Sequence, residues 1–125
     1  MMPRYTKEQQ LGRGERRYRR KVASPKQWQA IRAEKCRDCR VCRTRPVDGR
    51  SVIESHHLVP RDYHGDDVAD NIVGLCQACH RGVELREQNH CRLMLTRLSD
   101  AEYAYAVGKL GESGFEHVYG IEYQR

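Results

Sequence analysis

Two groups of cysteines in the chain have the spacing of metal ligands. A C-x-x-C pair lets two thiolates bind one ion, and two such pairs complete the tetrahedral coordination that zinc prefers. The six cysteines of these 125 residues are also fewer than a disulfide-stapled secreted domain would carry. We therefore expect a structural zinc site rather than disulfides or free thiols. The cysteines concerned are Cys36, Cys39 and Cys42 in the first group and Cys76 and Cys79 in the second.

The first group contains one cysteine more than the site needs. Cys39 can pair either with Cys36 or with Cys42 at the same spacing. We expect Cys39 and Cys42 to bind the ion together with Cys76 and Cys79, and Cys36 to lie at the end of the preceding helix. The alternative is that Cys36 replaces one of the first two. A site closed by four thiolates catalyses nothing, but its binding energy adds to the stability of the fold.

Three histidines near these pairs indicate a second, catalytic metal. The 33 residues between Cys42 and Cys76 exceed the roughly 15 to 20 that separate the pairs of a zinc ribbon, so the gap holds a further element. It contains the adjacent His56 and His57, and His80 directly follows the second pair. A hairpin and a helix joined by the zinc would bring these imidazoles together. Such a cluster binds a metal and leaves coordination positions open for a substrate.

The adjacency of His56 and His57 sets a geometric condition. Neighbouring residues of a flat strand point to opposite faces, so both can face the metal only if the strand bends there. Pro60 favours an early end of the strand. The alternative is one buried and one solvated histidine without a catalytic role. Glu54 shares a face with His56, where it either orients a ligand or is simply solvated.

Local signals predict an alternation of short helices and strands. Ser24 with Gln27, and Ser99 with Glu102, have the spacing of capping boxes that open helices. Short β-type runs follow the first cysteine group and precede the second. No element is assigned from residue 115 onward. The expected elements are a helix over 25–35, a turn at 47–49, a strand over 51–57, a loop over 61–70, a strand over 71–75, and helices over 77–89 and 100–110.

Basic residues concentrate at the beginning of the chain. The net charge is +6, and residues 1–23 alone hold eight basic and two acidic side chains. A basic segment suits a polyanion, because each phosphate that it neutralises releases counterions. We expect residues 1–23 to be a mobile DNA-binding arm, or alternatively a solvated or purification-derived tail. Residues 24–125 are expected to form one domain. The arm residues expected to contact DNA are Arg16, Arg17, Arg19, Arg20 and Lys21.

Nothing in the sequence indicates a membrane protein. The longest apolar stretches are about five residues long, far short of the roughly 18 that cross a bilayer, and no signal-peptide pattern opens the chain. We therefore expect a cytoplasmic protein, in the cytoplasm of the host cell if a phage encodes it.

Taken together, the motifs resemble those of the HNH endonucleases. The resemblance covers about residues 36–90. The chain also resembles small phage and prophage members of this family, which nick or cut DNA. The resemblance implies a ββα-metal core. Together with the cysteine spacing and the capping signals above, we expect an α+β fold in which this core has a four-cysteine structural zinc and is flanked by an N-terminal and a C-terminal helix. The matching string is a C-x-x-C pair, then His56-His57-x-x-Pro60, then Asp70-Asn71-Ile72-x-x-Leu75-Cys76-x-x-Cys79-His80.

The resemblance also implies a role for each residue at a motif position. His56 and His80 correspond to the ligands of one divalent ion, Mg²⁺, Mn²⁺ or similar, and His57 to the general base that takes a proton from water. Asn71 would tie the loop between the strands to the backbone, so that His57 keeps one orientation and tautomer. Arg61 would grip a phosphate beside the scissile one, or else is an ordinary surface arginine.

The function implied is metal-dependent hydrolysis of DNA phosphodiester bonds. Cleavage, by nicking or through both strands, would leave 5′-phosphate and 3′-hydroxyl ends. The alternative from another class is a non-catalytic, zinc-stabilised module that binds DNA through the arm. The intact base position favours the enzyme, because a binding module has no need of His57. DNA is the expected partner, and the resemblance implies phage packaging proteins as a further one. The sequence does not indicate a dimer interface.

Overall fold

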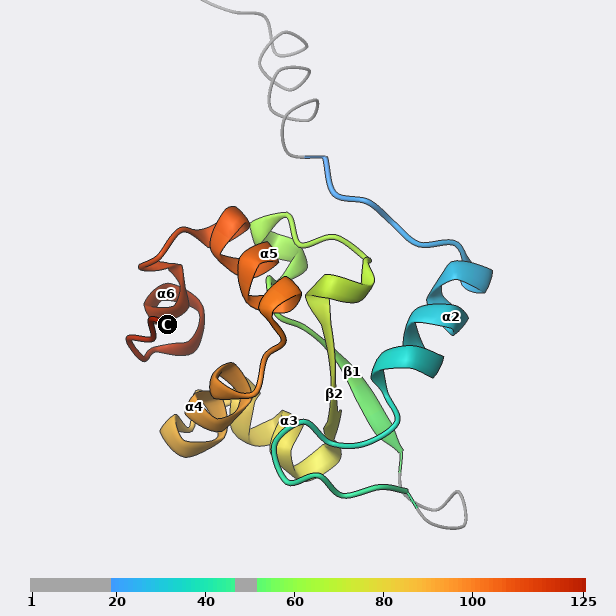
Figure 1. The fold of residues 1–125 in the computed structure, drawn as a ribbon, viewed down its shortest axis with the longest axis horizontal. Helices are drawn as coiled ribbons and strands as arrows, with labels where there is room; N and C mark the ends of the chain where they lie inside the picture. The colour runs from blue at the N-terminus through green and yellow to red at the C-terminus, as the bar shows by residue number, and fades with distance from the viewer. Residues whose placement is uncertain (1–18, 47–51) are drawn as a thin grey trace, which may run out of the picture.

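A two-stranded antiparallel hairpin lies at the centre of the molecule (Figure 1). The computed structural model describes residues 19–46 and 52–125. Strand β1 (Ile53–His57) pairs with β2 (Ile72–Cys76), with Ile53 opposite Cys76 and His57 opposite Ile72. Helix α3 (Gln77–Glu84) follows β2 directly and packs against both strands. The expected α+β class and the strand–strand–helix order are confirmed, and the predicted turn at 47–49 lies outside the described residues.

Helix α2 (Pro25–Lys35) covers one side of the hairpin, where it contacts β2 and the turn before it (Figure 1). Its predicted start is confirmed. The Ser24 side chain accepts from the N–H of Gln27, and the Gln27 side chain accepts from the N–H of Ser24. This capping box satisfies two backbone donors that the first turn would otherwise leave free.

The helix expected over residues 77–89 is two helices. α3 ends at Glu84, and α4 (Gln88–Thr96) starts again after a turn in which Arg86 has a φ of 58°. The Glu87 carboxylate caps α4 by accepting from the N–H groups of Asn89 and His90. The break lets α4 fold back on α3 and bury its apolar face in the core. A single continuous helix would have carried that face away from the core.

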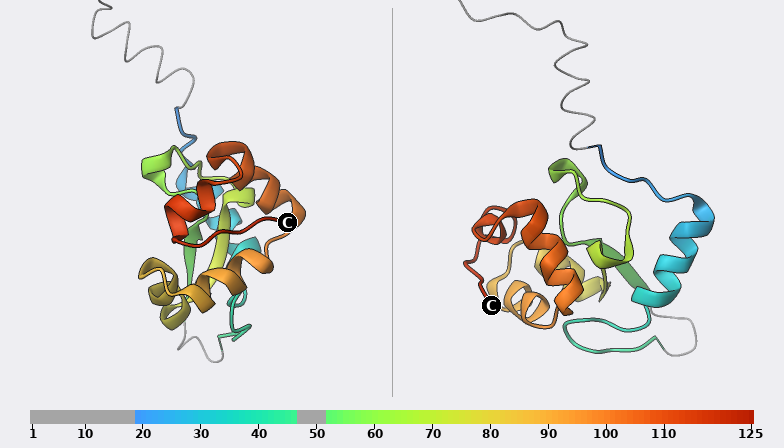
Figure 2. Two further views of the ribbon diagram at one scale, coloured as in Figure 1. Left: turned by 90° about the vertical axis from the view of Figure 1, so that its left-hand side faces the viewer. Right: turned by 45° about the horizontal axis from the view of Figure 1, so that its top comes forward.

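The C-terminal part of the chain closes the other side of the hairpin (Figures 1 and 2). α5 (Asp100–Leu110) begins at the predicted capping box of Ser99 and Glu102 and ends at Gly111. The unassigned tail contains a further helix, α6 (Gly114–Tyr119), which buries Phe115 and Tyr119. None of the helices in the two described stretches is long and apolar enough to cross a membrane.

The loop between the strands contains two short 3-10 turns, Arg61–Tyr63 and Ala69–Asn71. A β-carbon at Gly65 would lie 1.7 Å from the carbonyl oxygen of Val59, so only glycine allows this part of the loop to approach the end of β1. Residues 20–23 run along the same loop before they enter α2 (Figure 2). The end of the predicted mobile arm is thus hydrogen-bonded to the domain.

Glu102 is a buried carboxylate that joins three parts of the fold. It lies on α5, is fully buried, and forms ion pairs with Lys35 of α2 and with Arg40 of the first cysteine group. The second Arg40 contact, from Nη2 to Oε2, is 2.9 Å long. Burial alone would raise the pKa of Glu102, but the bonds from Arg40 and Lys35 outweigh it and lower the pKa to about 2.

We predict that Glu102→Gln lowers the free energy of unfolding by about 2 to 4 kcal/mol, because two half-buried cations, Lys35 and Arg40, lose their buried carboxylate partner. Since the pKa falls from 4.5 to about 2 on folding, the ionised group stabilises the fold above pH 4.5. That contribution disappears as the pH falls toward 2. Urea unfolding between pH 3 and 7 measures this, with the exposed Glu34→Gln as control. Equal stability of the two variants at pH 7 would contradict the prediction.

Candidate metal and catalytic site

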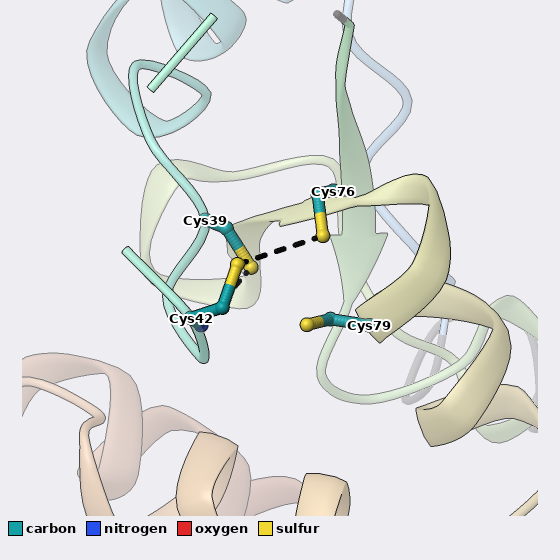
Figure 3. A group of neighbouring side chains, drawn as sticks. All are labelled: Cys39, Cys42, Cys76 and Cys79. Carbon is teal, nitrogen blue, oxygen red and sulfur yellow. Dashed lines mark hydrogen bonds between the residues drawn. The ribbon is translucent and has the colours of Figure 1, made fainter. Parts of the chain in front are cut away.

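Four cysteine sulfurs meet where the first cysteine group approaches the junction of β2 and α3 (Figure 3). They belong to the four favoured residues, Cys39, Cys42, Cys76 and Cys79, and all lie within 4.8 Å of one another. The sulfurs of Cys42 and Cys76 are 3.7 Å apart. A zinc ion with bonds of about 2.3 Å requires sulfur separations of about 3.8 Å, so the group fits a tetrahedral zinc site.

The remaining cysteines lie outside this group. Cys36 is the residue at which α2 ends, as expected, and Cys91 is buried on α4. All six cysteines belong to the described residues, and none of them forms a disulfide. The predicted choice among the three cysteines of the first group therefore agrees with the geometry.

The electrostatics of the four thiols favour a bound cation. Burial, followed by the neighbouring sulfurs of Cys76 and Cys39, raises the pKa of Cys79 far above its usual value. A hydrogen bond with the Thr44 hydroxyl lowers the pKa of Cys42 to about 6. Several thiolates cannot crowd together without a positive charge between them, and Zn²⁺ supplies that charge.

His56 and His80 approach each other across the hairpin–helix boundary. Their ring centroids are 5.3 Å apart and the rings lie nearly perpendicular, with His56 coming from β1 and His80 from α3. Burial lowers the pKa of His56 to about 3, with smaller contributions from His80 and His57. His56 is therefore a neutral imidazole, the form that binds metals.

Tyr119 of α6 determines which nitrogen of His56 carries the proton. The tyrosine hydroxyl lies 2.9 Å from Nε2 of His56 and donates its single proton to the carbonyl oxygen of Leu58, at 2.6 Å. Since that proton is used, Nε2 of His56 must be the donor to the hydroxyl. Nδ1 is then the unprotonated nitrogen available to a metal.

Two carboxylates flank His80. Nδ1 lies 2.8 Å from Oε1 of Glu54, and Nε2 lies 3.2 Å from Oε1 of Glu84. Glu54 thus orients the imidazole, which was one of its two expected roles. Glu84 was not singled out from the sequence, although its i, i+4 spacing from His80 on a helix was a usable signal. It adds an oxygen donor beside the two imidazoles.

Asn71 fastens the loop between the strands to the end of β1. Its buried side chain accepts from the N–H of Val59 at 2.8 Å and donates to the carbonyl oxygens of Val59 and Asp66, at 3.1 and 2.9 Å. The backbone carbonyl of Asn71 also accepts from the N–H of Leu58. These bonds fix the backbone that immediately follows His57.

His57 turns away from the other two imidazoles. It stacks on Trp28 of α2, with centroids 5.7 Å apart and an angle of 12° between the rings, and its Nε2 lies 2.8 Å from Oδ1 of Asp67. Burial lowers the pKa of His57, and the opposing effect of Asp67 does not restore it. His57 is therefore neutral near pH 7 and able to accept a proton. Neither Trp28 nor Asp67 had been assigned to the site.

The three histidines nevertheless line one open pocket of about 400 Å³. Glu84 and Tyr119 contribute to its wall, together with Pro60. The pocket joins the paired imidazoles of His56 and His80 to the separate imidazole of His57. A substrate held in it would lie beside all three imidazoles.

The basic residues expected to contact DNA have different positions. Arg61 is exposed on the turn after Pro60, close enough to His57 to lower its pKa. Arg19 and Lys21 are exposed, whereas Arg20 is half-buried and paired with Asp67. Arg16 and Arg17 lie outside the described residues.

Comparison with known proteins connects this geometry to a family. Residues 39–84 match the HNH endonuclease family. A 34-residue stretch is 47% identical to part of the type IV methyl-directed restriction enzyme EcoKMcrA of Escherichia coli (strain K12). That stretch is 27% of this chain and spans only 12% of the relative's length. No solved structure matches the chain significantly.

The matched residues contain the hairpin, α3, the four clustered cysteines and all three histidines of the pocket. Residues 39–84 are therefore similar to an HNH endonuclease domain, and four cysteines in this stretch are placed to bind a metal ion.

Proposed function

We propose that this protein is a metal-dependent DNA endonuclease that hydrolyses phosphodiester bonds at the pocket of the three histidines. The observation that carries the proposal is the position of His56 and His80, whose rings are 5.3 Å apart beside the pocket that His57 also lines. The HNH match and the restriction-enzyme relative support DNA as the substrate.

His56 and His80 are the residues that hold the catalytic divalent ion, and Glu84 is placed to add a carboxylate oxygen. The mixed nitrogen and oxygen donors suit Mn²⁺ or a similar ion and are compatible with Mg²⁺, which prefers oxygen. The ion supplies positive charge to offset the charge that develops on the phosphate and on the leaving 3′ oxygen. The four cysteines hold the structural zinc.

His57 is the general base in this proposal. Its neutral ring takes a proton from a water molecule, and the resulting hydroxide attacks the phosphorus. The P–O3′ bond breaks and the leaving 3′ oxygen takes a proton from the solvent, so the products are a 5′-phosphate and a 3′-hydroxyl. Asn71 keeps the backbone after His57 in place, and Arg61 holds a neighbouring phosphate. The residues of the arm contribute binding that is independent of DNA sequence.

For the base, we predict that His57→Ala slows metal-dependent nicking of supercoiled plasmid by about 100-fold or more, because general-base catalysis contributes about 10² to 10⁴. The assay compares Mn²⁺, Mg²⁺ and EDTA, and sequencing of the product ends checks the bond that is broken. His117→Ala, which removes an exposed imidazole, should cleave like the wild type. Plasmid left intact by the wild type with every metal, together with retained binding in a gel shift, would favour the non-catalytic DNA-binding module instead.

For the zinc site, we predict that Cys79→Ala loses the bound zinc and the cooperative thermal transition. The reason is that the metal joins the first cysteine group to the hairpin and α3. Zinc content by elemental analysis and a melting curve measure this. Cys36→Ala and the buried Cys91→Ala should both keep one zinc per chain. Zinc retained in Cys79→Ala with an unchanged melting temperature would refute the site.

For the arm, we predict that deleting residues 1–18 weakens DNA binding and flattens its salt dependence. The slope of log K against log salt should decrease by about 0.9 for each phosphate contact that is lost. This deletion is preferable to a longer one, because Arg20 and Lys21 bond to the domain. Arg16→Gln/Arg17→Gln should reproduce part of the effect, whereas Arg92→Gln, on the exposed face of α4, should not. An unchanged slope after the deletion would rule out this role.

A further inference from the structure

Asp67 contacts Nε2, one of the two ring nitrogens of His57. Asp67 is only 8% exposed, and its Oδ1 lies 2.8 Å from Nε2 of His57. Hydrogen bonds from His57 and from the Ala23 N–H, with the charge of Arg20, outweigh burial and keep the pKa of Asp67 below its usual value. An ionised carboxylate only accepts hydrogen bonds. The proton of this contact therefore belongs to Nε2 of His57.

Trp28 restricts the same ring in a second way. The indole stacks on the imidazole at 5.7 Å with the two planes 12° apart. Stacking fixes the plane of the His57 ring, and the bond to Asp67 fixes its rotation within that plane. Together the two contacts leave one orientation, in which Nδ1 is the nitrogen without a proton.

The carboxylate is itself held by the segment that precedes the family match. Arg20 pairs with Oδ1 of Asp67 and donates from Nε to the carbonyl oxygen of Gly65 at 2.9 Å. The N–H of Ala23 donates to Oδ2 at 3.1 Å. Residues 20–28 lie outside residues 39–84, yet they supply both the support of Asp67 and the stacking partner of His57.

Resting on the proposed role of His57 as the base, we propose that Asp67 is a positioning residue that holds His57 in the Nε2–H tautomer. Nδ1 of His57 is then the atom that takes the proton from water. After that transfer, the imidazolium lies beside the Asp67 carboxylate, which stabilises its charge in the way that a buried aspartate stabilises the histidine of a catalytic triad.

If Asp67 only stabilised the fold, replacing it would affect activity no more than replacing another buried aspartate of the same loop. The adjacent Asp66 provides that comparison. Asp66 is also buried and also binds the segment before α2, by accepting from the N–H of Lys21 at 2.6 Å. It is anchored by Tyr105 and Lys109 and has no contact with His57 among those of the described residues. Asp66→Asn thus disturbs the same segment without removing the partner of the base.

The experiment combines NMR of the histidine rings with steady-state cleavage. Long-range ¹H–¹⁵N spectra of zinc-loaded protein with ¹⁵N-labelled histidine report the tautomer of His57, assigned with His57→Ala. We expect Nε2–H in the wild type and in Asp66→Asn, and a mixed or Nδ1–H population in Asp67→Asn. With an oligonucleotide duplex and Mn²⁺, Asp67→Asn should lower kcat at least tenfold and change KM less than twofold, whereas Asp66→Asn should keep kcat within threefold.

The outcomes separate this inference from the function on which it rests. Full activity of His57→Ala would overturn the base assignment, while the spectra would still decide the contact with Asp67. Loss of activity in His57→Ala, with kcat and tautomer unchanged in Asp67→Asn, would overturn only the role of Asp67. Equal losses of kcat in the two aspartate variants would do the same. An Nδ1–H tautomer of His57 in the wild type would overturn the proposed role of Asp67 without any variant. The proposal can therefore be tested even if Asp67→Asn fails to fold.

Discussion

The four-cysteine cluster sets the position of His80 relative to His56. It connects the loop at residues 39–42 to the point where β2 becomes α3, and His80 is the residue directly after Cys79. Fixing this junction sets where α3 begins relative to the hairpin, and hence the distance from His80 to His56 on β1. Two five-residue strands and an eight-residue helix are too short to hold such a geometry by themselves. A zinc ion bound by the four cysteines would therefore both stabilise the fold and, in the proposed function, set the distance between the two metal-binding histidines.

Buried polar groups hold distant segments together in the parts of the fold that the cysteine cluster does not reach. Asn71 holds the loop between the strands, Asp66 and Asp67 hold the segment before α2, and Glu102 joins α5 to α2 and to the cysteine loop. Within the described residues, every buried side-chain nitrogen or oxygen has a hydrogen-bond partner. Removing one partner of such a group leaves the other buried and unpaired, so these contacts specify a single arrangement of irregular chain.

Features that depend on neighbours in the sequence could be predicted, and features that depend on distant residues could not. Both capping boxes and the C-x-x-C pairs are local patterns, and their helices and cluster were found where expected. The break at Arg86 was missed because arginine rarely adopts a positive φ and nothing in its type signals one. Asp67, Trp28 and Tyr119 were missed for another reason. Each reaches its histidine across 10 to 63 positions of sequence, through a fold that only the assembled core defines.

The alternation of the strand explains how two adjacent histidines serve different purposes. A bend in β1 had been expected to bring His56 and His57 to one metal, but both remain in the strand, opposite Val73 and Ile72. His56 accordingly meets His80 and Tyr119, while His57 meets Trp28 and Asp67. A base that shared the ligand cluster would lose its lone pair to the ion, because a coordinated nitrogen cannot accept a proton. In the proposed mechanism, the different contacts of the two histidines keep metal binding and proton transfer on separate rings, and the pocket that both rings line is where they would reach the same substrate.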